Sequence, residues 1–110
     1  MIDKEKIYSL LGRHIGFVKG GYSGIDPNVE DAFWQPMIEE LSKDVDETIA
    51  FIDELDQIEF ECTLEILDEL IEKTQSLKLL EAVKKIGKEK HINKVYLDNS
   101  VERASYWLND

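Results

Sequence analysis

Apolar residues recur at helical spacing through most of this 110-residue chain. In the segments 44–55, 63–73 and 77–87, they follow one another at intervals of three and four residues, which places them on one face of a helix. A β-strand needs strict alternation, which the chain shows only weakly at 91–98, a segment that we interpret as a loop or a short strand. The predicted core includes Val45, Ile49, Ile52, Leu64, Ile66, Leu67, Leu70, Ile71, Leu79, Leu80, Val83 and Ile86.

Residues 1–25 are predicted to form a short helix and a glycine-rich loop. Ile7, Leu10 and Leu11 fit one helical face, which Gly12 should end. Five glycines occur in 12–24, a density that favours a loop, with a short extended piece at 14–19. This loop does not match a phosphate-binding P-loop, because Lys19 precedes the paired glycines instead of following them.

The helical core is predicted to span 26–110, and capping residues indicate where its helices begin. Asp26 followed by Pro27 is typical of an N-cap and a first helical residue. Pro36 then either kinks this helix or begins a second one. Gly87 is expected to end or fray the helix that begins near residue 77. The candidate N-caps of the later helices are Asp44 with Glu47 as reciprocal partner, Thr63, Ser76, and Asn99 with Glu102.

The spacing of these segments predicts an all-α fold. Helices of about twelve residues with short connections normally pack as antiparallel neighbours. We therefore expect a single-domain bundle of short antiparallel helices, and the segments 44–55, 63–73 and 77–87 favour HEAT-like stacked helix pairs over an irregular bundle. A hydrophobic fraction of 43% is sufficient for a packed core.

Charge is separated along the chain. Residues 26–72 contain seventeen Asp and Glu against one basic residue, Lys43, whereas 73–94 contain seven Lys and two Glu. The first block therefore dominates the formal net charge of −11. An acidic surface repels nucleic acids and anionic lipids and attracts basic proteins. We therefore expect a protein partner, with no direct contact to nucleic acid or membrane.

The predicted partner-binding residues lie on two helices and the connection between them. Acidic residues three and four apart share one helix face, although like charges at this spacing cost a few tenths of a kcal/mol each. The alternative interpretation is a solvent-exposed face without a binding role, but such a face normally includes lysines. We favour a binding role in electrostatic steering and ion pairing. The candidates are Asp46, Glu47, Asp53, Glu54, Asp56, Glu59, Glu61, Glu65, Asp68, Glu69 and Glu72.

Motifs for catalysis or metal binding are not recognised in the sequence. The acidic run at 53–65 lacks the central glycine of an EF-hand loop, and the chain has no Glu-x-x-His pair. His14 and His91 do not have zinc-site spacing with Cys62. We therefore expect no enzymatic activity, no metal and no cofactor. Cys62 is expected to be a semi-buried, unreactive thiol in an acidic setting.

The cellular location is expected to be the cytoplasm. The chain has a single cysteine and so no internal disulfide. Its first residues mix acidic and basic side chains, unlike a signal peptide, and no apolar stretch is long enough to span a membrane.

The run from 44 to 89, DVDETIAFIDELDQIEFECTLEILDELIEKTQSLKLLEAVKKIGKE, resembles small helical immunity proteins encoded beside bacterial polymorphic toxins. These include the immunity proteins of contact-dependent growth inhibition systems. The similar features are the acidic helix ETIAFIDEL, a helix ending in ELIEKTQS, the lysine-rich helix that follows, and the closing VERASYWL. The resemblance covers about two thirds of the chain, and the glycine-rich N-terminal segment has no counterpart.

This resemblance implies a function. Such proteins bind a cognate toxin domain in the cytoplasm of the producing cell and usually block its active site. Many of those toxins are nucleases with basic clefts, which an acidic helical face would occlude. The alternative is an acidic helical adaptor or regulator that binds basic cellular proteins, with weaker affinity for several partners. An enzyme using carboxylates as acid and base would need a cleft and raised carboxyl pKa values.

Overall fold

The computed structural model describes residues 1–19 and 28–109, and every regular element in this part of the chain is helical. The elements are α1 (Lys4–Lys19), the π-helical turn η1 (Glu30–Trp34), α2 (Gln35–Leu41), α3 (Val45–Asp53), α4 (Gln57–Leu64), α5 (Leu67–Thr74), α6 (Leu77–Glu89) and α7 (Lys94–Ser105). The all-α prediction is therefore confirmed, with seven α-helices in the described ranges. No helix among these residues is both long and apolar enough to cross a membrane.

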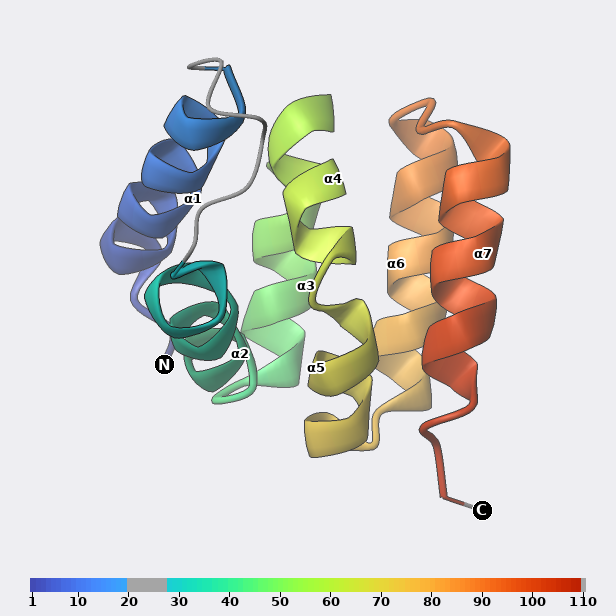
Figure 1. Ribbon diagram of the computed structural model, residues 1–110. Coiled ribbons are helices and arrows are strands. Elements are labelled where there is room, and N and C mark those ends of the chain that lie inside the picture. The colour runs from blue at the N-terminus through green and yellow to red at the C-terminus, as the bar shows by residue number, and fades with distance from the viewer. Residues whose placement is uncertain (20–27, 110) are drawn as a thin grey trace.

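Helices α3 to α7 stack in two layers (Figure 1). Helices α3 and α6 pack together in the rear layer of this view. Helices α4 and α5 follow one another end to end in the front layer, where α5 packs against α7. Helix α1 contacts both α2 and α4 and closes one end of the stack. A single hydrophobic cluster runs through these layers, from Ile2 and Ile7 to Leu97 and Ala104.

Helix α1 is longer than predicted. Gly12 does not end it, and 14–19 is helical where the sequence favoured an extended piece in a loop. Ile7, Leu11 and His14 are all buried on one face, so the packing of this face outweighs the low helix propensity of the glycines. The rest of the predicted glycine-rich loop and the predicted Asp26 cap lie outside the described residues.

Pro36 lies in the first turn of a second helical segment, as one of the two alternatives predicted. The preceding turn is π-helical, with the Gln35 N–H donating to the Glu30 carbonyl. A proline lacks an N–H and its ring conflicts with the carbonyl four residues earlier. The wider π turn gives the chain a different hydrogen-bond register at this point, and Phe33 is buried beside it.

Helix α4 lies where the sequence was interpreted as a connection between two helices. Asp56 caps it, accepting from the Glu59 N–H at 2.8 Å, while the Asp56 N–H donates to the Glu59 carboxylate at 3.0 Å. Thr63 was predicted to cap the next helix, but it lies inside α4 and donates to the Phe60 carbonyl at 2.6 Å. The helical path breaks at Ile66, and α5 continues from there.

Two predicted caps are confirmed. The Glu47 N–H donates to Asp44 at 3.0 Å, and the Leu79 N–H donates to Ser76 at the same distance. The predicted reciprocal contact is not formed, because the Glu47 side chain accepts from the Ile2 N–H at 3.4 Å and not from the Asp44 N–H. The predicted core residues of these helices are buried, except that Val45 and Ile49 are half-buried.

The C-terminal region departs from the prediction. Gly87 lies within α6, and a Cβ at this position would come within 2.6 Å of Leu97 Cδ1, so the glycine allows α7 to approach closely. Most of the segment 91–98, predicted as a loop or a short strand, belongs to α7. Asn93 caps this helix by accepting from the Tyr96 N–H at 3.1 Å. Asn99, the predicted cap, lies inside this helix.

Candidate functional site

The eleven predicted binding residues do not share one continuous face. Those of α3 lie beside basic groups of neighbouring elements: Asp46 pairs with Lys78 of α6 at 2.6 Å, and Glu54 pairs with Lys4 of α1 at 2.8 Å. Glu47 lies 3.9 Å from the N-terminal ammonium. Asp53 is exposed beside α6. The acidic charge of α3 is therefore largely compensated within the molecule.

The acidic residues of α4 and α5 follow the front layer. We define the acidic ridge as Glu61, Glu65, Asp68, Glu69 and Glu72. Of these, Glu61, Glu69 and Glu72 are exposed and make no ion pair with any described residue. Glu69 accepts only a hydrogen bond from the Gln35 amide at 3.3 Å. These three carboxylates are therefore available to an external cation. Asp56 and Glu59, in contrast, form the cap of α4.

The other two ridge residues tie helices together. Asp68 Oδ2 lies 3.0 Å from Arg103 Nε, which joins α5 to α7, while Asp68 Oδ1 is buried without a hydrogen-bond partner. Glu65 Oε2 lies 2.9 Å from His14 Nε2, which joins the α4–α5 junction to α1. These two contacts position the ridge between the elements on either side of it.

Exposed aromatic residues lie near both ends of the ridge. Tyr96 is 38% exposed, and its hydroxyl lies 3.4 Å from the Glu61 carbonyl. Burial, followed by the charges of Glu65 and Glu61, raises the Tyr96 pKa, so its hydroxyl stays protonated at neutral pH. Trp107 is 46% exposed, and its carbonyl accepts from the Gln75 amide at 2.8 Å, just beyond the end of α5. The Tyr96 side chain thus borders one end of the ridge, and the backbone of Trp107 lies beside the end of α5.

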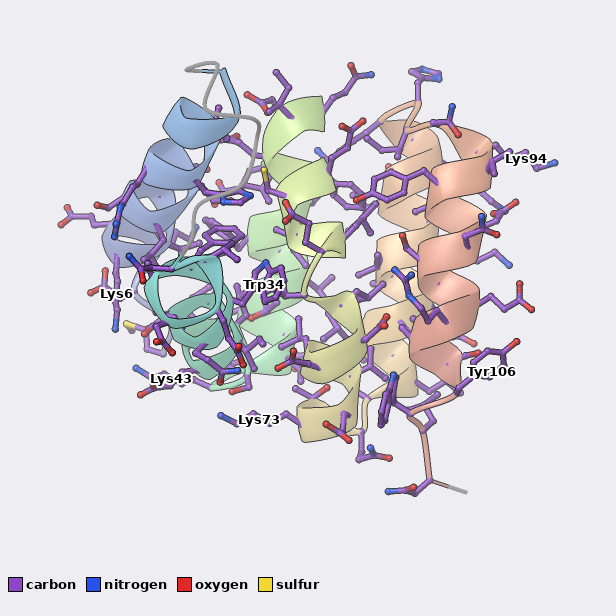
Figure 2. All side chains as sticks on the ribbon, in the orientation of Figure 1. Lys6, Trp34, Lys43, Lys73, Lys94 and Tyr106 are labelled. Atoms are coloured by element: carbon purple, nitrogen blue, oxygen red, sulfur yellow. The ribbon has the colours of Figure 1, made fainter. Side chains whose placement is uncertain are left out.

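The surroundings of these aromatics are partly charged. Figure 2 shows Tyr106 at the end of α7 and Lys73 at the end of α5. Tyr106 is 74% exposed, and its hydroxyl donates to Glu102 at 3.0 Å. Asn109 donates its backbone N–H to the Gln75 side chain at 2.7 Å, which holds the segment after α7 against the end of α5.

Three side chains that can bind a metal ion meet between α1 and α4, and this cluster was not predicted from the sequence. One ligand atom each of His14, Cys62 and Glu65 lies within 4.8 Å of the other two. His14 and Cys62 are 5% and 7% exposed, so Cys62 is more buried than the semi-buried thiol that we expected. The His14 ring stacks on Phe33 with centroids 4.0 Å apart, and its Nδ1 has no hydrogen-bond partner.

Cys62 is not an activated nucleophile. Burial, followed by the charges of Glu65 and Glu61, raises the pKa of the Cys62 thiol to about 12. A thiol with such a pKa remains protonated at neutral pH, whereas a reactive cysteine needs a lowered value. The one sequence signal for this cluster was the position of His14, which continues the buried face of Ile7 and Leu11.

No protein-family model, curated protein or solved structure matches this chain significantly. The similarity to immunity proteins therefore remains a prediction from the sequence runs quoted above.

Proposed function

We propose that the protein binds a basic protein domain through the acidic ridge and neutralises it, in the manner of an immunity protein acting on a toxin in the cytoplasm. The observation that supports this proposal is the set of unpaired, exposed carboxylates of Glu61, Glu69 and Glu72 on one pair of helices. With a formal net charge of −11, the whole molecule attracts a basic surface before contact. The unpaired carboxylates then decide where that surface binds.

The aromatic residues near the ridge supply what charge alone does not. Exposed ion pairs contribute little binding free energy, whereas buried aromatic side chains at the centre of an interface often contribute most of it. Tyr96 and Trp107 are both partly exposed, and each has an atom in contact with α4 or the end of α5. In the proposed complex, the carboxylates accelerate association and orient the partner, and the two rings slow its dissociation.

The proposed partner is a toxin domain with a basic cleft, most simply a nuclease. A nuclease cleft binds the phosphates of nucleic acid with lysines and arginines. Carboxylates, like phosphates, offer negatively charged oxygens to these side chains. Stoichiometric binding, without catalysis, is the function that we propose for this surface.

The proposal is tested by affinity capture with three matched baits. These are the unaltered protein, a ridge variant (E61Q, E69Q and E72Q) and a control variant (D53N, E81Q and E89Q). Both variants lose three exposed negative charges, so they differ only in where the charge is removed. We expect the unaltered and control baits to retain one stoichiometric protein with a basic domain, and the ridge bait to lose most of it. Expression of that domain alone should arrest growth, and co-expression of this protein should restore it.

Other outcomes contradict the proposal. Equal capture by all three baits would place the interface elsewhere. Several weakly held, salt-sensitive proteins, none of which arrests growth, would support the adaptor alternative. A captured domain that is harmless when expressed alone would exclude toxin neutralisation even if the ridge binds it.

A further inference from the structure

The cluster of His14, Cys62 and Glu65 has the composition of a transition-metal site. It offers an imidazole nitrogen, a sulfur and a carboxylate oxygen, which are the three ligand types that zinc takes in proteins. Two of these residues come from α4 and its C-terminal end and the third from α1, and these two helices lie side by side in Figure 1. The site therefore stands on two packed helices and shares only Glu65 with the acidic ridge.

We propose that His14, Cys62 and Glu65 bind a zinc ion, with one His14 nitrogen, the Cys62 sulfur and one Glu65 carboxylate oxygen as ligands and a fourth position open to water. Ligand atoms around tetrahedral zinc lie roughly 3.3–3.6 Å apart, given bond lengths of about 2.0–2.3 Å. The ligand atoms here lie within 4.8 Å of one another, with 2.9 Å between His14 Nε2 and Glu65 Oε2. The three atoms would therefore have to shift by roughly 1 Å to take up tetrahedral positions.

The burial of His14 is a second and independent indication. Its side chain is 5% exposed, and Nδ1 has no hydrogen-bond partner, which is uncommon for a buried polar atom. A hydrogen bond between His14 and Glu65 alone gives a partner only to Nε2 and does not involve Cys62. A metal bound at Nδ1 would give that nitrogen the partner it lacks and would use all three residues, and stacking on Phe33 holds the imidazole plane in one orientation.

Charge and proton balance are consistent with a divalent cation. On binding, the Cys62 S–H bond breaks, its proton goes to solvent and the sulfur–zinc bond forms. The neutral imidazole keeps its one proton on the nitrogen that does not bind the metal. The thiolate and the Glu65 carboxylate then balance the two positive charges of zinc.

The test uses zinc and its spectroscopic substitute cobalt with the full chain. We expect one equivalent of cobalt to bind and to give sulfur-to-metal charge-transfer absorption together with the visible bands of a tetrahedral site. Zinc should displace cobalt, release one proton per ion near pH 7, and raise the unfolding temperature by roughly 10 °C at about one hundred times its dissociation constant.

Variants distinguish this site from adventitious binding to surface carboxylates. Cys62→Ser should abolish the charge-transfer band, and His14→Gln and Glu65→Gln should each weaken zinc binding at least tenfold. His91→Gln removes the other histidine, which is exposed, and should change nothing. Thermal unfolding of each variant without metal shows whether it folds. Cobalt spectra without a sulfur band in the unaltered protein would overturn the proposal. So would zinc affinities of the folded Cys62→Ser and His14→Gln variants that equal the affinity of the unaltered protein.

Discussion

At the scale of single residues, replacing Gly12 in α1 and Gly87 in α6 by alanine should change the stability of the protein in opposite directions. A Cβ at Gly12 would meet nothing within 4 Å, whereas at Gly87 it would lie 2.6 and 2.7 Å from the two Cδ atoms of Leu97. Gly12→Ala should therefore stabilise the protein by about 0.5–1 kcal/mol, because alanine favours a helix. Gly87→Ala should destabilise it by about 1–3 kcal/mol through overpacking. Urea unfolding of both variants checks this, and equal effects at the two positions would contradict the close approach of α6 and α7.

Glu40 is the most completely buried carboxylate described. Its side chain is 1% exposed, and it accepts from Lys43 at 3.0 Å and from the Asp3 N–H at 2.7 Å. Glu40→Gln should destabilise the protein by about 2 kcal/mol, because a charge-assisted network loses its central charge. Glu39→Gln, at the exposed neighbouring position, should change the unfolding free energy by less than about 0.5 kcal/mol. Similar losses in the two variants would mean that Glu40 is not held as described.

The contribution of Glu40 should depend on pH. The hydrogen bonds from Lys43 and then from the Asp3 N–H lower the pKa of Glu40 in the folded protein. A carboxyl with a lowered folded pKa stabilises the protein fully above its unfolded pKa of about 4.3 and loses this effect as pH falls through the folded value. The stability difference between the unaltered protein and Glu40→Gln should therefore shrink progressively below about pH 4.3. A difference that stays constant in an acid titration followed by circular dichroism would exclude this origin.

At the scale of elements, α4 depends on its capping box. Asp56→Ala should cost about 1 kcal/mol, because it leaves the Glu59 N–H at the start of α4 without its partner. Asp53→Ala is a matched control, since this exposed acid lies at the C-terminal end of α3, where the helix dipole disfavours it. Hydrogen exchange should become faster in α4 of the first variant only. Unchanged protection of α4 would show that packing, not the cap, determines its stability.

The sequence predicted helices best where one face alone is buried. Helices α5 and α6 have a single apolar face, and the buried set of Leu79, Leu80, Val83 and Ile86 was identified from spacing alone. Helix α4 was missed because its buried residues, which include Phe60, do not lie on one face and so leave no helical period. Helix α1 was predicted too short. Glycine lowers helix propensity, but it does not prevent packing from extending a helix.

The site was only partly predictable for a related reason. Composition and spacing located the acidic residues, but whether each one is free depends on contacts between distant positions. Asp46 pairs with Lys78 and Glu54 with Lys4, and neither pairing is visible in local sequence. The proximity of His14 to Cys62 likewise depends on how α1 packs against α4. Tertiary packing therefore distinguishes the ridge from the other acidic residues.

At the scale of the whole molecule, negative charge is in excess but unevenly compensated. Lysines of α1 and α6 pair with acids of α3, whereas on the ridge Glu61, Glu69 and Glu72 have no ion pair with any described residue. Uniform negative charge would speed association with any basic protein, while a localised excess gives a basic partner one preferred orientation. We therefore attribute binding to the position of three carboxylates, while the net charge of the molecule contributes only to the rate of encounter.

The most direct test measures the association rate of the captured basic domain with the unaltered protein, the ridge variant and the control variant at low and high salt. We expect the ridge variant to associate about tenfold more slowly at low salt, the control variant to stay within about twofold, and the differences to shrink at high salt. Equal slowing of both variants would mean that net charge alone governs binding. Rates that neither variant changes would contradict the acidic ridge as the interface.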